Sequence, residues 1–485
     1  MNKPIARLFG LVVVMFALLI AFTSRWTVFD AKALQNNKLN ARTLLETQRI
    51  RRGTIYADNG TALADSVSQP GAVYTRFYPF GSLFAAPVGY AFPNQLAAGL
   101  ELYRNGVLTG TPIQHESVID QLEGKQNGGD SVYTTLDPAA QQVAMSALAA
   151  THLSGAVVAM VPSTGAVKVF ASFPSYNPNL IPEPRALAAS DAASDDGLPG
   201  PEYDRVTEAQ DPPGSIQKVV TAIAAIDTGQ FTPTSLVNGN SPQTFEGIPL
   251  NNDENTSYGE ITLTDGLTNS VNTVYANVAQ KVGGTILARY MYRLGYYRKP
   301  PIDLPSGELK ASGVRDQLDG PLIPPTGAVD VPLMGIGEGH LLVSPLQMVM
   351  VASAVANGGR LMTPYLTDYV TDADGSIVLR TKPTLFSTVM KPATATAVGN
   401  MMEDVVQDGT AEAALAGFKI QVAGKTGTAE LGNSKNSPND AWFIAYAPGK
   451  DIAVAVDVED TFDYGASAAA PIARDVIQSL VGGSS

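Results

Sequence analysis

The stretch DPPGSIQKVVTAIAAIDTG, residues 211–229, joins a turn rich in proline and glycine directly to an apolar run. Apolar residues recur at helical spacing from Val219 to Ile226, which predicts a helix with one face packed inward. Side chains three residues apart lie on the same side of a helix, so the hydroxyl of Ser215 and the amine of Lys218 can touch.

Two interpretations of this stretch are open at this point. Ser215 can be an ordinary helix N-cap with a solvated lysine one turn later, which is a common use of serine. Alternatively, Ser215 can be a nucleophile with Lys218 as its base, because the free backbone N–H groups at a helix start favour negative charge. Ser-x-x-Lys occurs only here in the chain, but this stretch taken alone favours the N-cap.

The composition excludes several classes of function. The chain has 485 residues, 45% of them hydrophobic, which is enough for two or three globular domains. A net charge of -13 argues against a nucleic-acid partner. There are no cysteines, which excludes disulfides and cysteine-ligated metals, and none of the three histidines is spaced for a metal site. A serine nucleophile would have few histidines to serve as its base, which favours a lysine base.

The N-terminus predicts a membrane anchor. Lys3 and Arg7 precede an uncharged apolar run from Leu8 to Ser24, and no clear cleavage pattern follows it. We expect residues 1–26 to be a cytoplasmic tip and an uncleaved transmembrane signal anchor, with the rest of the chain outside the cytoplasm. A cleaved signal peptide is the competing interpretation.

The remaining chain is expected to fold as α+β. Short alternating runs and the turn signal at Asn59-Gly60 predict a β-rich stalk, or pedestal, over residues 27–150. Residues 151–485 are expected to form the second domain. It would begin with a hairpin at Gly155 and end with three antiparallel strands and a covering helix. The polar stretch 182–200 is expected to be a surface loop.

Two further motifs lie downstream of Ser215. Ser270 and Asn272 place a hydroxyl and an amide at a predicted helix junction, where they can relay a proton and hold a substrate carbonyl. Ser-x-Asn alone is uninformative, because it also begins at Ser175, Ser434 and Ser437. The segment KTGTAE, residues 425–430, sets a cation, a hydroxyl and a glycine on a predicted edge strand, where the glycine lets a peptide backbone approach. The competing interpretation of KTGTAE is an ordinary exposed strand with a solvated lysine.

The order of the three motifs decides between these interpretations. Ser-x-x-Lys, Ser-x-Asn and Lys-Thr-Gly together are the signature set of penicillin-binding proteins and serine β-lactamases. Of the four Ser-x-Asn candidates, only Ser270 falls between Ser215 and Lys425. Each motif also has the predicted context that its role needs: a helix start, a helix junction and a sheet edge.

With these motifs in place, the chain resembles the class B penicillin-binding proteins over nearly its whole length, and in particular a short actinobacterial form. RRGTIYADNGTALA, RFYPFGSLFAAPVGY and GLELYRNGVLTG are similar to the stalk blocks of that family. The family order continues with TTLDPAAQ, PSYNPN, PPGSIQK, NSVN, GIGEGHLLVSPLQM and GKTGTAE. Val271 and Ser344 are mild departures from the usual residues, and the short stalk leaves little room for an extra partner domain.

The resemblance implies a role for each site residue. Ser215 would be acylated, Lys218 would take its proton, Ser270 would relay a proton to the leaving group and Asn272 would hold the donor amide. Lys425 and Thr426 would support Ser270 and the substrate carboxylate, Gly427 would let the strand lie against the donor, and the backbone N–H groups of Ser215 and Thr428 would form an oxyanion hole. Burial beside Lys425 would lower the pKa of Lys218 by desolvation and by like charge.

The implied activity is D,D-transpeptidation of peptidoglycan stem peptides, with β-lactams acylating the same serine and with no metal or organic cofactor. The chain before Gly155 is too short for a glycosyltransferase domain besides the stalk. The implied partner is therefore a membrane glycosyltransferase of the shape, elongation, division and sporulation class. Two alternatives remain: a D,D-carboxypeptidase or β-lactamase-like hydrolase, although no acidic residue is obviously placed to activate water, and a non-catalytic muropeptide sensor.

Overall fold

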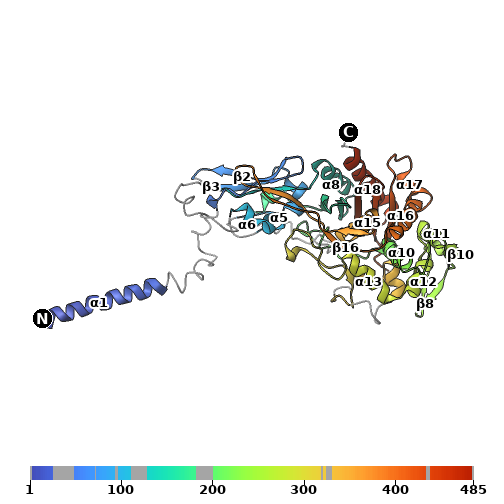
Figure 1. Ribbon diagram of the computed structural model, residues 1–485, viewed down its shortest axis with the longest axis horizontal. Coiled ribbons are helices and arrows are strands. Elements are labelled where there is room, and N and C mark those ends of the chain that lie inside the picture. The colour runs from blue at the N-terminus through green and yellow to red at the C-terminus, as the bar shows by residue number, and fades with distance from the viewer. Residues whose placement is uncertain are drawn as a thin grey trace.

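The computed structural model describes residues 3–25, 48–71, 73–92, 97–110, 128–181, 200–317, 320–323, 330–432 and 437–482. They form an N-terminal helix and an α+β body with two main sheets (Figure 1). The predicted surface loop at 182–200 lies almost entirely outside the described residues. Within the described residues, the α+β class expected from the sequence is confirmed.

The first helix, α1 (Lys3–Ser24), is long and apolar enough to cross a membrane. Its 22 residues span about 33 Å at the usual helical rise, slightly more than the roughly 30 Å hydrocarbon core of a bilayer. Its apolar side chains are exposed, as a lipid-facing surface requires. The apolar N-terminal helix that the sequence predicted is therefore present.

A six-stranded sheet with the order β15-β14-β4-β1-β2-β3 forms the core of the β-rich stalk. Its strands are β1 (Ile55–Tyr56), β2 (Ala62–Gln69), β3 (Val73–Phe77), β4 (Ser131–Thr134), β14 (Thr367–Thr371) and β15 (Ile377–Arg380). The turn at Asn59-Gly60 joins β1 to β2 as expected, with Gly60 at φ 81°. The sequence did not predict that β14 and β15 join this sheet from far downstream, so the division at residue 150 stays a prediction.

Stacked tyrosines show why β14 adds to this sheet. The rings of Tyr56 and Tyr133 stack at 4.6 Å, and those of Tyr133 and Tyr369 stack at 4.3 Å across β1, β4 and β14. The guanidinium of Arg380 on β15 lies 4.8 Å from the ring centre of Tyr369 and ends the row. Cross-strand aromatic pairs stabilise a sheet, so this row ties the downstream hairpin to the stalk.

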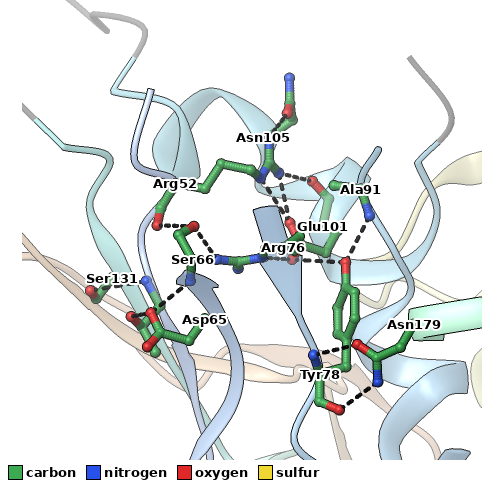
Figure 2. Close-up of polar contacts among 11 residues, drawn as sticks. Arg52, Asp65, Ser66, Arg76, Tyr78, Ala91, Glu101, Asn105, Ser131 and Asn179 are labelled. Atoms are coloured by element: carbon green, nitrogen blue, oxygen red, sulfur yellow. Dashed lines mark hydrogen bonds and ion pairs between the residues drawn. The ribbon is translucent and has the colours of Figure 1, made fainter. Parts of the chain in front are cut away.

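A buried carboxylate organises the other side of the stalk, as Figure 2 shows. Glu101 lies in α5 (Gly99–Tyr103), is fully buried and forms ion pairs with Arg52 and Arg76. Against burial, which acts to raise it, the two guanidinium groups hold the pKa of Glu101 below its ordinary value. Asn179, which follows strand β6 of the second main sheet, bonds the backbone N–H and carbonyl of Tyr78 beside this cluster.

The second main sheet has five antiparallel strands in the order β17-β18-β19-β5-β6. The strands are β5 (Gly155–Met160), β6 (Val167–Phe173), β17 (Ala423–Glu430), β18 (Asn439–Ala447) and β19 (Ile452–Thr461). The expected hairpin, the three C-terminal strands and the covering helix α18 (Gly465–Gly482) are all confirmed. β17 lies at the edge of this sheet, as the sequence predicted.

Helices cover both faces of the five-stranded sheet. α18 and α8 (Pro138–Thr151) pack on one face, and α15 (Pro345–Ala356) packs on the other (Figure 1). Asp137 caps α8 by accepting a hydrogen bond from Ala140 N, as the Asp-Pro pair predicted. The other longer helices are α10 (Lys218–Asp227), α11 (Leu263–Thr268), α12 (Asn272–Val282), α13 (Gly284–Leu294), α14 (Val331–Ile336) and α16 (Pro392–Gln407).

Shorter elements complete the chain. The short helical turns are η2 (Gly81–Phe84), α4 (Ala85–Val88), α6 (Asn105–Leu108), η3 (Pro178–Leu180), η4 (Gly214–Gln217), η5 (Asp253–Asn255), η6 (Ser306–Glu308) and α17 (Glu412–Leu415). The two-stranded pairs are β7 (Leu236–Asn238) with β10 (Glu260–Thr262), β8 (Gln243–Phe245) with β9 (Ile248–Leu250), β11 (Gly313–Val314) with β12 (Leu341–Leu342), and β13 (Arg360–Met362) with β16 (Leu385–Thr388).

Replacing Glu101 by Ala should lower the free energy of unfolding by roughly 3–5 kcal/mol, because two arginines would be left without their buried counter-charge. Urea unfolding followed by fluorescence measures the loss. The control is Asp368→Asn, which removes the partially exposed pair with Arg380 and should cost about 0–1 kcal/mol. Equal losses in the two variants would contradict a stabilising role for the buried cluster.

Candidate active site

Ser215 lies in the 3-10 turn η4, and Lys218 is the first residue of α10. The serine does not cap the helix, because neither η4 nor α10 has a side-chain cap hydrogen bond. Its Oγ lies 2.8 Å from Lys218 Nζ instead. The N-cap interpretation is therefore wrong, and the expected contact between hydroxyl and amine is present.

Three glycines allow the turn before Ser215 to pack tightly. Gly214 has φ 53°, and a Cβ there would lie 2.7 Å from the carbonyl oxygen of Thr428. A Cβ on Gly427 would lie 2.8 Å from the carbonyl oxygen of Pro213, and one on Gly337 would meet the backbone of Gly214. Gly427 thus permits the approach of strand β17 to this turn, a use that the sequence did not indicate.

The second motif reaches the serine from the junction of α11 and α12. Ser270 has φ 56°, which is uncommon outside glycine and turns its backbone sharply between the two helices. Lys218 Nζ lies 2.6 Å from the Ser270 carbonyl oxygen, 3.3 Å from Ser270 Oγ and 2.6 Å from Asn272 Oδ1. The amine thereby joins the first two motifs.

The third motif closes the site from β17. Lys425 Nζ lies 2.8 Å from Ser270 Oγ and 2.9 Å from the Thr426 carbonyl oxygen. Ser270 Oγ thus lies between the two lysine amines. The structure brings Ser215, Lys218, Ser270, Asn272 and Lys425 into one continuous set of polar contacts.

Burial controls the charge of both lysines. The side chains of Lys218 and Lys425 are fully buried, and Lys218 has no carboxylate within ion-pair distance among the described residues. Desolvation lowers the pKa of Lys218 to about 7, against the attraction of the Glu338 and Asp253 carboxylates. Burial, followed by repulsion from Lys218, lowers the pKa of Lys425 well below its ordinary value. The pKa of Lys218 is lowered in the expected direction, but by desolvation alone, since the expected repulsion between the two lysines acts on Lys425.

The remaining predicted residues lie along the same edge strand. Thr426 is buried, and its Oγ1 lies 2.6 Å from Thr410 Oγ1. Thr428 is partly exposed, and its Oγ1 accepts a hydrogen bond from Gly465 N. No strand pairs with β17 on its outer edge in the described part of the chain. An extended peptide can therefore add to this edge beside Ser215.

Two nearby residues were not predicted from the sequence. Thr410 follows α16 and contacts Thr426, and Glu338 lies in the turn after α14, where its carboxylate acts to raise the pKa of Lys218. Glu338 is inside the segment GIGEGHLLVSPLQM, whose likeness to the family could have drawn attention to it. Its proximity to Lys218 could not be predicted, because the two residues are remote in sequence. Thr410 has no local signal of its own.

This geometry places a serine hydroxyl beside a buried amine, an arrangement that suits acyl transfer, on the fold of a penicillin-binding transpeptidase. Residues 155–478 match the family described as the penicillin binding protein transpeptidase domain. Residues 52–132 match the penicillin binding protein A dimerisation domain. The chain belongs to the penicillin-binding protein transpeptidase family.

Named relatives place the chain near one kind of protein within that family. It is 32% identical to the peptidoglycan D,D-transpeptidase PbpA of Mycolicibacterium smegmatis, over 98% of both chains. It is 31% identical to PbpA of Mycobacterium tuberculosis over the full length of both. The ceftriaxone acyl-enzyme complex of penicillin-binding protein A from M. tuberculosis has a TM-score of 0.80 and 28% identity, covering 90% of this chain and 100% of that one.

Gly427→Ala should destabilise the protein by about 1–3 kcal/mol, because the added methyl group would overlap Pro213 O and Ile216. Thermal unfolding measures the effect. The control is Gly106→Ala in α6, where a Cβ meets nothing within 4 Å and the change should be neutral or slightly stabilising. An unchanged melting temperature for Gly427→Ala would show that the approach of β17 to the turn is looser than described.

Proposed function

We propose that this protein is a peptidoglycan D,D-transpeptidase that works through an acyl-enzyme on Ser215. The observation that carries this proposal is the fully buried amine of Lys218, which has a pKa of about 7 and lies 2.8 Å from Ser215 Oγ. Near neutral pH such an amine is uncharged part of the time and can accept the hydroxyl proton. The full-length similarity to proteins named D,D-transpeptidase supports the reaction class.

In the acylation step, Ser215 Oγ attacks the carbonyl carbon of the penultimate D-Ala in the donor stem peptide while Lys218 Nζ takes its proton. The backbone N–H groups of Ser215 and Thr428 stabilise the negative charge that develops on the carbonyl oxygen. Ser270 Oγ lies within hydrogen-bond distance of both lysine amines and passes the proton to the departing nitrogen. The C–N bond breaks and D-Ala leaves.

In the second step, the amine of a neighbouring stem peptide attacks the ester carbonyl. It loses a proton to the same lysine and serine pair, and Ser215 regains its hydroxyl proton as the new amide forms. Until D-Ala leaves, the donor peptide lies along β17, with Lys425 and Thr426 beside the carboxylate of its terminal D-Ala, and Gly427 and Thr428 along its backbone. Asn272, whose Oδ1 accepts from Lys218, orients the donor amide.

A hydrolase remains the second candidate because of Glu338. Its carboxylate lies near enough to Lys218 to act on the charge of that amine, and an acidic group near the site could support attack by water in place of an amine. The stability of the β-lactam adduct separates the two functions. A long-lived adduct supports the transpeptidase, and rapid release of opened β-lactam would support hydrolysis.

For the cell, we propose that α1 is a signal anchor with Lys3 and Arg7 inside and the remainder of the chain outside the cytoplasm. The likeness to class B enzymes supports a membrane glycosyltransferase of the shape, elongation, division and sporulation class as the partner that polymerises glycan. Copurification from detergent-solubilised membranes tests this pairing. Its persistence after α1 is exchanged for an unrelated transmembrane helix would exclude α1 as the contact.

Ser215→Ala should abolish labelling by fluorescent penicillin while leaving the melting temperature nearly unchanged, because only one hydroxyl oxygen is lost. Gel fluorescence and intact-mass spectrometry detect the adduct. The matched control, Ser270→Ala, keeps the nucleophile and should label more slowly, with the adduct still on residue 215. A penicillin adduct on the Ser215→Ala protein would remove this serine from its role.

The rate of acylation should rise about tenfold per pH unit below pH 6 and level off above about pH 8, because the neutral form of Lys218 is the base. Stopped-flow measurements with a chromogenic β-lactam provide the profile. Lys218→Arg keeps a positive charge that does not dissociate, so its residual rate should lack the rise. A flat wild-type profile between pH 5 and 8 would contradict a lysine base with this pKa.

A further inference from the structure

A second group of ionisable side chains lies next to the turn that leads into Ser215, which we call the nucleophile turn. This group takes no part in the proposed reaction. Oxygens of Asp211, Asp457 and Glu459 all lie within 4.8 Å of one another. Asp211 is four residues before Ser215, whereas the other two lie on β19 in the centre of the five-stranded sheet. Two segments that are remote in sequence thus direct three carboxylates to one point.

These carboxylates lack the hydrogen-bond donors that buried acidic groups need. Asp457 is fully buried, and its carboxyl group contacts that of Asp211, but no backbone or other side-chain donor reaches its oxygens in the described part of the chain. Asp211 Oδ2 is buried and without a donor in the same residues. Glu459 is the exception, since its Oε2 accepts from Arg205 Nε at 3.0 Å. An ionised carboxylate without any donor is costly in the protein interior, so the cluster calls for a positive charge.

The local charge balance is strongly negative. Three carboxylates face a single guanidinium, that of Arg205. Asp440 on β18 is also buried close to Glu459, and its Oδ1 accepts from Asp460 N. If all three carboxylates are ionised, their charge together with that of Arg205 is about -2, which one divalent cation would balance.

We propose that Asp211, Asp457 and Glu459 are the protein ligands of a hard divalent cation, Ca²⁺ or Mg²⁺, that joins the nucleophile turn to β19. Carboxylate oxygens are the preferred ligands of both ions. Two oxygens on opposite sides of Ca²⁺ lie roughly 5 Å apart, so the observed spacing fits one shared ion. Three oxygens that converge on one point fit a cation better than a single shared proton, which can bridge only two of them.

The position of the cluster links such a cation to the acylation site. The backbone N–H and carbonyl of Asp211 both bond Val343, at 3.1 and 2.9 Å. The indole of Trp442, which pairs with Asp457 across the sheet, donates to the Pro212 carbonyl oxygen at 3.0 Å. A cation held by Asp211 and Asp457 would add a further link between this turn and the sheet. It would thereby hold in place the segment that leads from Asp211 to Ser215.

The test uses the full-length protein in detergent micelles at pH 7, freed of metal with EDTA. Thermal unfolding is followed while CaCl₂ or MgCl₂ is added at constant ionic strength, and equilibrium dialysis with radioactive Ca²⁺ measures the binding stoichiometry. Acylation by fluorescent penicillin is recorded in parallel. The variants are Asp457→Asn and Asp211→Asn. Asp374→Asn, on the exposed turn between β14 and β15, is the matched control.

The proposal predicts a saturable rise of about 2–4 °C in the melting temperature of the wild type and the control once the cation exceeds its Kd about tenfold. One ion should bind per chain, and both effects should be lost in Asp457→Asn and Asp211→Asn. Comparing the CaCl₂ and MgCl₂ arms identifies the ion. If one variant does not fold, the other still decides the outcome.

Two results would overturn the proposal. One is a wild type that shows no saturable response to either cation. In that case protons would neutralise the carboxylates, and the wild type would lose stability as the pH rises, because raised carboxyl pKa values make ionisation costly in the folded state. The other is an equal cation response in the wild type and both variants, which would place the binding elsewhere on the acidic chain.

Discussion

The site depends on the burial of one amine. Lys218 has no exposed surface, and no carboxylate of the described residues is in direct contact with it, so the protein interior favours its neutral form. Its nitrogen still has four oxygen neighbours, on Ser215, Ser270 and Asn272. The same burial that removes the charge thus fixes the positions of the hydroxyls around it. A more exposed lysine would be a stronger base in water but would be charged at neutral pH.

Close backbone packing keeps this amine buried. The turn at Gly214 fits between β17 and the segment at Gly337 with no room for a Cβ at any of the three facing glycines, Gly214, Gly337 and Gly427. Ser270 adds a backbone turn at positive φ, which lets its carbonyl and its hydroxyl both face Lys218. The site is therefore defined by backbone geometry as much as by its reactive side chains.

Local sequence signals predicted much of the fold. Asp137-Pro138, Asn59-Gly60 and the apolar runs at the C-terminus marked the helix, the turn and the strands that the structure contains. The order of three short motifs was enough to identify the residues that gather around Lys218. What the sequence did not show depends on segments that are remote in sequence but close in space: strand β14 joining the stalk, Glu338 acting on the pKa of Lys218, and Asp211 meeting Asp457.

The stalk and the catalytic half are joined by such remote contacts as well. Asn179 bonds the backbone of Tyr78, and Arg104 of the stalk pairs with Asp303. Because the hairpin of β14 and β15 also crosses between the two halves, the stalk is built partly from the chain that follows the active-site serine. Both halves therefore depend on correct folding of the full chain.

The most direct measurement is the pKa of Lys218 itself, from ¹³C NMR of protein labelled at lysine Cε and assigned by comparison with Lys218→Arg. The account predicts one lysine resonance that titrates near pH 7 in the free enzyme and is absent from the variant. A Lys218 resonance that titrates near pH 10 would mean that the amine is charged at neutral pH, and would contradict its role as the base.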